Sequence, residues 1–232
     1  MANLKIFYTN SFPCGYFKDL KACYLLLDPE VKPDIDLQEH LTAQGYRRSG
    51  QSLYYPWCNN CLRCVPLRLD VNDFKPNRSQ KRCLKKNANT RVVETAPVLN
   101  PDIFDLYKDY QKWKHPGAGM DECQDFSSMD FLLADWADTR FNQIYHNDQL
   151  AGVAVTDIFN NSLSAVYTFY DKKFSGLSLG TYAILWQIKL AQQLNLDYLY
   201  LGYYIKDSKK MSYKANFKPH EFLLNGQWHS TR

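Results

Sequence analysis

The stretch FNQIYHNDQLAGVAVTDIFNNSLSAVYTFY, residues 141–170, decides the fold. It contains three runs whose composition suits β-strands, Phe141–His146, Leu150–Phe159 and Leu163–Tyr170. Asn147-Asp148 and Asn160-Asn161 separate these runs, and both residue types tolerate the left-handed backbone of a tight turn. The stretch therefore predicts an antiparallel meander of three strands.

The residues after the meander complete a longer order of elements. A loop with Gly176 and Gly180 comes first, then a helix over about Leu179–Leu194 and a strand over Tyr198–Tyr203. This β-β-β-loop-α-β order resembles that of GNAT-superfamily acyltransferases, in which the loop and the helix N-terminus hold a phosphate of the acyl donor. We therefore expect an α+β fold, with a GNAT-like domain over residues 98–232.

Before the meander the sequence predicts shorter elements. The expected helices include one capped by Asp34 or Asp36 and stopped by Gly45, and others over Asn77–Asn87, Pro101–Lys114 and Ser127–Trp136. The expected extended segments are residues 1–13, Tyr46–Tyr55, Val65–Val71 and Asn89–Glu94. We expect a smaller cysteine-containing N-terminal region over residues 1–73, and a basic helix with a linker over residues 74–97.

The bulk composition is that of a soluble protein of the cytoplasm. Of the 232 residues, 45% are hydrophobic and 22% are charged, which is ordinary for a globular chain. No run approaches the roughly 20 apolar residues of a membrane span, and residues 1–17 lack the apolar core of a secretory signal. Seven cysteines, an odd number with clustered spacing, favour a reducing compartment. We therefore expect no membrane partner.

Three cysteines at two-residue spacing, Cys58, Cys61 and Cys64, are the first candidate site. A tetrahedral zinc ion or an iron–sulfur cluster takes four ligands, so a fourth cysteine is needed. Cys14 in PCGYF is the best fourth candidate and Cys23 a weaker one. Buried free thiols are an equal alternative. The two remaining cysteines are interpreted as packing residues, Cys83 and Cys123.

A block from Lys75 to Arg91 carries seven basic residues and no acidic one. Such charges repel one another unless a polyanion screens them, which favours phosphate binding over a merely solvated face. The residues expected to bind phosphate are Arg78, Lys81, Arg82, Lys85 and Lys86.

Catalytic candidates gather after the last predicted strand of the domain, in Tyr200–Glu221. Tyrosine and lysine can donate to a developing oxyanion, which makes candidates of Tyr203, Lys210 and Tyr213. Glu221 and Asp157 are candidate proton acceptors. Arg47-Arg48 offers a guanidinium for carboxylate capture, although a strand would point only one of the two into a pocket.

With these residues quoted, the chain resembles the arginyl-tRNA–protein transferases, and most closely the bacterial aspartate/glutamate leucyltransferases. The matching stretches include PCGYF, GYRRSG, YYPWCNNCLRCVPLRLDV, FKPNRSQKRCLKKN, YKDYQKWKHPGAGM and KMSYKANFKPHE. Two positions depart from the pattern. Phe17 replaces the second cysteine of the pair found in eukaryotic relatives, and Leu177 stands where relatives often have arginine.

The resemblance implies that an amino acid, leucine rather than arginine, passes from charged tRNA to the α-amine of proteins that begin with Asp or Glu. The new N-terminal residue marks the product for degradation. The chemistry requires no cofactor, because transfer from an aminoacyl ester to an amine is downhill. Arg47, Arg48 and Lys214 are the candidates for binding the acidic N-terminus. The alternatives are an acyl-CoA-dependent N-acetyltransferase and a non-enzymatic metal-bearing RNA-binding module.

Overall fold

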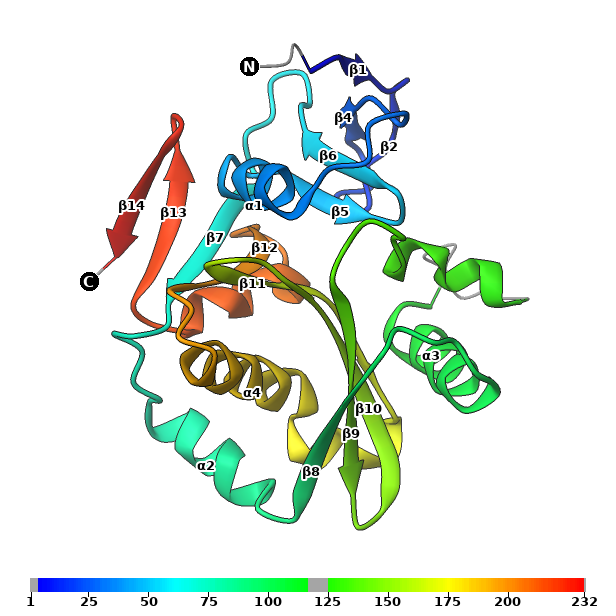
Figure 1. Cartoon of the computed structure of the whole chain (residues 1–232), viewed down its shortest axis with the longest axis vertical. Coiled ribbons are helices and arrows are strands. Elements are labelled where there is room, and N and C mark those ends of the chain that lie inside the picture. Colours follow the sequence, from blue (N-terminus) through cyan, green and yellow to red (C-terminus); the bar gives the residue numbers. More distant parts are fainter. Residues whose placement is uncertain (1–3, 117–124, 232) are drawn as a thin grey trace.

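The computed structural model describes residues 4–116 and 125–231. Most of the loop expected at residues 115–120, together with Cys123, lies outside the described residues. Two main sheets build the molecule, one of four strands near the N-terminus and one of eight strands. Figure 1 shows the four-stranded sheet at one end of the larger sheet. Among the described helices, none is long and apolar enough to cross a membrane.

The eight-stranded sheet confirms the predicted meander. Its strand order is β14-β13-β7-β12-β11-β10-β9-β8. The meander consists of β9 (Thr139–His146), β10 (Gln149–Ile158) and β11 (Ser162–Tyr170), all antiparallel. Asn147 and Asp148 have positive φ angles of 49° and 60°, as expected for this turn. The strand β8 (Thr90–Thr95) pairs with β9 at the edge of the sheet.

The strand β12 (Tyr198–Tyr204) lies parallel to β11, but the two strands pair over only three residues. Ser162–Ser164 pair with Tyr198–Tyr200, and beyond these residues the strands part. Gly202 has a φ of +75°, and the register of β12 against β7 shifts between Tyr200 and Tyr203. We call the segment where the strands part, beyond Ser164 and Tyr200, the strand fork.

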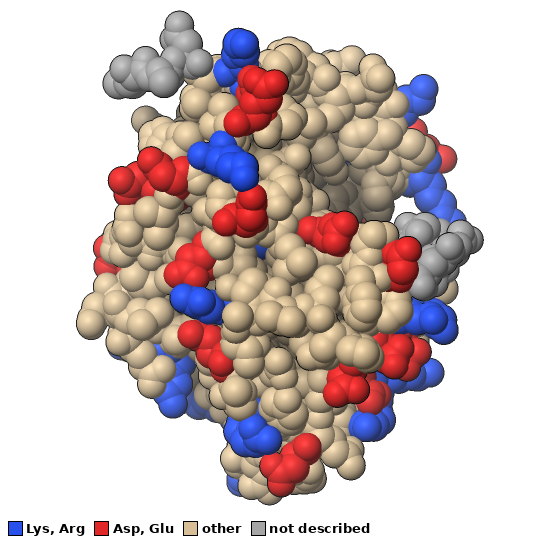
Figure 2. All heavy atoms as spheres, turned by 45° about the vertical axis from the view of Figure 1, so that its right-hand side comes forward, with Lys and Arg blue, Asp and Glu red and all other residues tan. Residues whose placement is uncertain are grey.

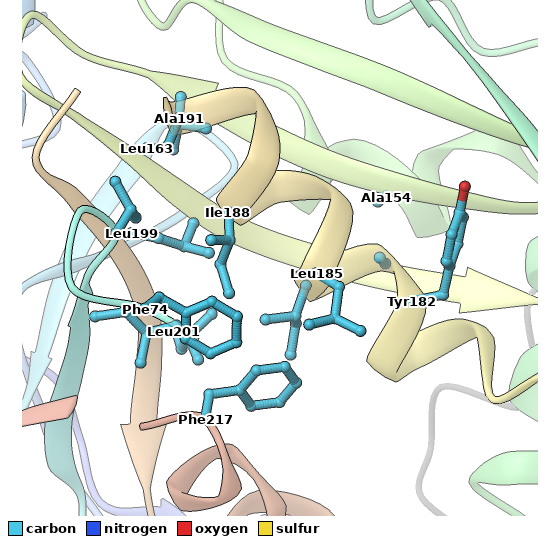
Figure 3. Close-up of a cluster of buried hydrophobic side chains, with 14 of the residues drawn as sticks. Phe74, Ala154, Leu163, Tyr182, Leu185, Ile188, Ala191, Leu199, Leu201 and Phe217 are labelled. Atoms are coloured by element: carbon cyan, nitrogen blue, oxygen red, sulfur yellow. The ribbon is translucent and has the colours of Figure 1, made fainter. Parts of the chain in front are cut away.

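Helices cover both faces of the sheet and form its two cores (Figure 1). On one face α4 (Leu179–Gln193) buries Leu185 and Ile188 among Leu163, Leu199 and Leu201, as Figure 3 shows. On the other face α3 (Pro101–Lys114) packs against the meander, where the buried residues are Ile103, Tyr107, Tyr110, Phe141, Val153, Val155 and Phe169. Because side chains alternate along a strand, Ala154 joins the first core while its neighbours Val153 and Val155 join the second.

The four-stranded sheet has the order β1 (Ile6–Tyr8), β4 (Tyr24–Leu27), β6 (Ser52–Pro56) and β5 (Arg47–Ser49). The helix α1 (Ile35–Ala43) packs on it around Leu41 and Leu53. As predicted, the Asp34 carboxylate accepts a hydrogen bond from the Leu37 N–H, at 2.8 Å, and Gly45 ends the helix with a φ of +94°. A small two-stranded sheet of β2 (Phe12–Pro13) and β3 (Lys21–Ala22) completes the region.

The strand β7 (Val65–Asp70) joins the two regions of the chain. It lies between β12 and β13 (His220–Leu224) inside the eight-stranded sheet, and β13 pairs with β14 (Gln227–Thr231). The expected boundary after residue 73 places β7 in a different region of the sequence from β12 and β13. In the structure β7 nevertheless pairs with both strands. The α+β fold class is confirmed.

Two expected elements differ from the structure. The predicted α-helix at Ser127–Trp136 is wrong, because the chain forms a 3-10 helix, η1 (Phe126–Leu132). The carbonyl of Phe131 accepts from the Gly50 N–H at 2.7 Å, and the carbonyl of Leu132 accepts from Arg48 at 3.0 Å. These two carbonyls are therefore not available for the hydrogen bonds of a longer helix. The loop expected after β12 contains α5 (Lys209–Ser212), η3 (Tyr213–Asn216) and β13.

Candidate active site

Arg48 and Asp157 form a buried ion pair. The Arg48 Nε and Nη2 atoms donate to the two Asp157 carboxylate oxygens at 2.7 and 2.8 Å, and Thr139 donates to the same carboxylate at 2.7 Å. The two side chains are only 2% and 1% exposed. Each group satisfies the other away from solvent, which disfavours Asp157 as a proton acceptor and Arg48 as a ligand of the acceptor's acidic residue. Both roles stay predictions.

Arg47 points to the other side of β5 and reaches the strand fork. Its Nη2 atom donates to the carbonyl of Ala165, at 2.7 Å, directly after the last paired residue of β11. A Cβ at Gly202 would lie 3.3 Å from the Arg47 Nε, so glycine gives the guanidinium room on the β12 side. Arg47 is 9% exposed, and its Nη1 atom has no hydrogen-bond partner among the described residues. A buried cation therefore keeps one donor unused at the fork.

Lys214 lies beside Arg47. Its Nζ atom donates to the carbonyl of Tyr203 at 3.1 Å, in the part of β12 that has left β11. Burial and the nearby Arg47 charge lower the pKa of Lys214 to about 7, while Cys64 opposes this shift. Two adjacent cations thus lie at the fork, and an anion placed between them would relieve their repulsion.

Tyr203 is a structural residue rather than an oxyanion donor. It is 3% exposed, and its hydroxyl donates to the carbonyl of Gly45 at 2.8 Å. Burial raises the pKa of Tyr203 well above its usual value, which keeps the phenol neutral. The only proton of the phenol is already donated within the fold, which disfavours the predicted catalytic role of Tyr203. That role stays a prediction.

Lys210 and Tyr213 lie on α5 and η3, directly before Lys214 in sequence. The Lys210 Nζ contacts Nδ1 of His115 at 3.0 Å, which joins α5 to the end of α3. Burial, Lys210 and Lys114 lower the pKa of His115 to about 4, so this imidazole is neutral at neutral pH. Burial of the phenol and the nearby Tyr170 raise the pKa of Tyr213 to about 12, so it keeps its proton.

Glu221 lies away from the strand fork. Its carboxylate accepts from the Arg68 Nε at 2.6 Å, and the Arg68 guanidinium lies over the rings of Tyr198 and Trp228, 3.7 and 4.4 Å from their centroids. Arg68 on β7 pairs with Tyr200 on β12 and with Glu221 on β13. At Tyr200, β12 is still paired with β11. Glu221 thus belongs to an aromatic and ionic cluster near the sheet edge, and its role as proton acceptor stays a prediction.

The basic helix is α2 (Arg78–Lys86), capped as predicted by Asn77, whose side chain accepts from the Gln80 N–H at 3.0 Å. It packs against the first turn of α4. Lys86 donates to the Gly176 carbonyl at 3.1 Å, and Asn87 to that of Leu177 at 2.8 Å. The five cations named for phosphate binding are all exposed, and within residues 4–116 and 125–231 none forms an ion pair: Arg78, Lys81, Arg82, Lys85 and Lys86.

The four cysteines named as metal ligands line one small cavity of about 20 Å³: Cys14, Cys58, Cys61 and Cys64. Burial and then the three other thiols raise the pKa of Cys64 to about 12, so this thiol is protonated. No three His, Cys, Asp or Glu side chains of the described part of the chain are arranged to hold a metal ion. The four thiols nevertheless surround one cavity, and the metal or cluster site stays a prediction. Phe17, which replaces a cysteine of the relatives, lies under the Arg63 guanidinium at 4.7 Å.

Comparison with known proteins matches both halves of the chain to one family. The profile of the N-terminal part of arginine-tRNA-protein transferases matches residues 12–82, and that of the C-terminal part matches residues 102–224. The chain belongs to the arginine-tRNA-protein transferase family. Curated relatives named aspartate/glutamate leucyltransferase include those of Pseudomonas fluorescens, 42% identical over 98% of this chain and 97% of the relative, and Pseudomonas syringae pv. tomato, 44% identical over the same shares.

Solved structures similar to the chain are more distant. FemX has a TM-score of 0.48 at 11% identity and covers 82% of this chain and 65% of its own. The C-terminal domain of an Agrobacterium fabrum lysylphosphatidylglycerol synthetase has a TM-score of 0.46 at 11% identity, over 61% of this chain and 46% of its own.

In this member of the arginine-tRNA-protein transferase family, the structure groups some predicted residues and separates others. Arg47 and Lys214 meet at the strand fork, with Tyr213 next to Lys214 in η3. His115 was missed by sequence reasoning, as were the aromatic residues around it on α3 and β11. Their signal was present in YKDYQKWKH, where aromatic residues recur at three-residue spacing toward the end of a helix.

Proposed function

We propose that the protein transfers leucine from leucyl-tRNA to the α-amine of proteins whose first residue is Asp or Glu, which creates a degradation signal. The observation that carries the proposal is the pair of adjacent cations at the strand fork, the buried Arg47 and the half-buried Lys214. The Arg47 Nη1 has no partner, and Lys214 lies close enough to Arg47 for its pKa to fall. A buried, unpaired guanidinium donor suits an acidic side chain, because charge-assisted hydrogen bonds are the strong ones.

The acidic side chain of the acceptor binds between Arg47 and Lys214. A carboxylate there neutralises the repulsion between the two cations and satisfies the Nη1 donor. An acceptor that begins with Asn or Gln offers the same shape without the charge and leaves the cations unpaired. The site therefore selects for charge.

The reaction itself needs little from the protein beyond placement. The α-amine attacks the ester carbonyl of the aminoacyl-tRNA, a C–N bond forms, and the C–O bond to the ribose breaks as that oxygen takes up a proton. A free α-amine has a pKa of about 7.7–8.0, so part of it is already neutral at physiological pH. Positioning supplies much of the acceleration. Of the predicted proton donors, Tyr213 and Lys210 remain candidates, because Tyr213 directly precedes Lys214 and Lys210 lies on α5 just before it.

The helix α2 holds the tRNA. Its cations are exposed and form no ion pair with the described residues. Lys86 contacts Gly176 in the 3-10 helix η2 (Lys172–Leu177), which Ser178 joins to α4. A helix N-terminus attracts phosphate, so the backbone of α4 and the side chains of α2 act on the same polyanion. We place the protein in the cytoplasm, where its tRNA and protein substrates occur. No step is derived from a metal at the cysteines.

The deciding experiment measures transfer of labelled leucine from leucyl-tRNA to peptides that begin with Asp, Glu or Ala. We expect transfer to the first two only. In parallel reactions, arginyl-tRNA or acetyl-CoA replaces leucyl-tRNA as the donor. Acetyl transfer without leucyl transfer would identify an N-acetyltransferase, and tRNA binding without any transfer would leave an RNA-binding module.

The variant Arg47→Met tests whether the Arg47 guanidinium binds the acidic residue of the acceptor. Loss of a charged hydrogen bond of about 1.5–3 kcal/mol predicts a KM for the Asp peptide raised roughly 10- to 100-fold, with the KM for leucyl-tRNA unchanged. Lys32→Met, at an exposed ion pair with Asp135, is the matched control. An unchanged KM for the Asp peptide in Arg47→Met would remove Arg47 from the acceptor site.

A further inference from the structure

An aromatic cluster lies next to the strand fork, and of its residues only Tyr213 has a candidate role in the function proposed above. It consists of Tyr110 and Trp113 on α3, Tyr170 at the end of β11 and Tyr213 on η3. We infer that this aromatic cluster binds the leucyl side chain of the donor and excludes a cationic side chain such as that of arginine. This inference rests on the proposed function.

The rings of the cluster come from three separate elements and contact one another. Their centroids are 5.2 Å apart for Tyr110 and Tyr170, and 5.8 Å for both Trp113–Tyr170 and Tyr110–Trp113. Tyr213 lies near two of these rings, since it contributes to the raised pKa of Tyr110 and Tyr170 contributes to its own. Figure 2 shows the surface hollowed on the side of the molecule that carries α3. Apolar ring faces of this kind suit a branched aliphatic side chain.

The position of the cluster fits the chemistry at the fork. Tyr213 and Lys214 are consecutive residues, so the aromatic cluster and the acceptor site meet at η3. A leucyl group with its side chain on the rings can thus present its ester carbonyl toward the acceptor amine. The cluster also holds one unused donor, because the buried Trp113 Nε1 has no partner among the described residues. A ligand oxygen would satisfy it.

The charges around the cluster disfavour arginine. Lys114 Nζ lies 5.0 Å from the ring centre of Trp113 and 6.0 Å from that of Tyr170, and Lys210 contacts His115 beside Tyr110. Asp171, which follows Tyr170, is paired with Lys173 at 3.2 Å. Asp109, which precedes Tyr110, is exposed. Among the described residues, a guanidinium entering the cluster would meet cations and no free buried carboxylate, which selects against it.

The test compares kcat/KM for leucyl-tRNA and arginyl-tRNA with one Asp peptide. Loss of apolar contacts on one side chain typically costs about 10- to 200-fold in specificity, so we expect Tyr170→Ala to lower kcat/KM for leucyl-tRNA by at least tenfold. Lys114→Glu places an acid at the cluster and should raise the arginyl-to-leucyl ratio at least tenfold. Tyr8→Ala, at a residue 67% exposed on β1, is the control and should change neither value.

Thermal unfolding of each variant separates lost folding from lost specificity. If Tyr170→Ala does not fold, Lys114→Glu still decides, because Lys114 is exposed. The inference is overturned if the wild type transfers leucine but Lys114→Glu changes the arginyl-to-leucyl ratio of kcat/KM by less than twofold. The proposed function would still stand in that case. A wild-type protein that transfers no leucine refutes the proposed function itself, and with it this inference.

Discussion

Two adjacent arginines, Arg47 and Arg48, show how strand geometry assigns different roles to identical residues. Their side chains point to opposite faces of β5. Arg48 enters a closed network with Asp157, Thr139 and Gln38, whereas Arg47 reaches the strand fork with a donor unused. The network holds β5 against β10, and this contact fixes the direction in which Arg47 points.

The buried pair makes Asp157 a stability residue. Asp157→Asn leaves the Arg48 charge buried and unpaired, which is expected to cost about 3–5 kcal/mol of unfolding free energy. Urea unfolding measures this loss. The pH profile of the remaining folded enzyme should match that of the wild type. A variant with wild-type stability and abolished turnover would instead restore Asp157 as the proton acceptor.

Lys214 makes acceptor binding depend on pH. Its pKa is lowered to about 7 by burial and Arg47, so the lysine loses its charge as the pH rises through neutrality. The KM for the Asp peptide is expected to rise between pH 6 and pH 8.5, and Lys214→Arg should flatten that rise because arginine stays charged. Both enzymes use the same peptide, so ionisation of its amine cancels in the comparison. Parallel pH profiles for the two enzymes would contradict the role of Lys214.

At the scale of elements, α2 carries cations on a short helix whose buried side anchors it to α4. Cys83 and Asn87 face the core and the loop before α4, while the charged side chains face solvent. Capping by Asn77 and Gln80 stabilises a helix that charge repulsion would otherwise weaken. The sequence alone predicted this helix, its cap and its exposed charges, because all three depend on local spacing.

Charge reversal on α2 tests the tRNA surface. The double variant Lys81→Glu/Arg82→Glu is expected to raise the KM for leucyl-tRNA at least tenfold, and to lower the slope of log K against log salt by about 1 per lost phosphate contact. Lys189→Glu, an exposed cation of α4, is the control. Steady-state kinetics measures the KM, and filter binding at several salt concentrations measures the slope. A double variant with an unchanged slope would place the tRNA elsewhere.

At the scale of the whole molecule, β7 makes one sheet from the two sequence regions. It is an interior strand between β12 and β13, so the C-terminal residues cannot complete their own sheet. The order of β8–β12 and α4 was predictable from period-two runs and turn residues. The β13–β14 hairpin was missed, although Asn225-Gly226, with φ angles of 51° and 76°, is a strong hairpin-turn signal. Its place in the eight-stranded sheet was not predictable, because that place depends on pairing with the distant β7.

A fragment of residues 98–232 tests this dependence. Without β7 it exposes an edge of β12 and frees β13 from the sheet, so we expect no cooperative urea transition and a tendency to aggregate. A chain that starts at residue 9 lacks only the exposed edge strand β1 and should unfold nearly as the full chain does. Cooperative unfolding of the 98–232 fragment would show that the C-terminal half is an independent domain.

The sequence by itself determined the fold class, the capped helices and the basic surface, because hydrophobic period, turn residues and charge spacing act over a few residues. It also placed the candidate groups in the right segments. Only the tertiary structure decided which of them remain available. Asp157, Arg48, Tyr203 and Glu221 are satisfied by partners 18 to 158 residues away in sequence, whereas Arg47, Lys214 and Tyr213 meet at the fork. Pairing between distant residues depends on strand register, which short-range patterns do not encode.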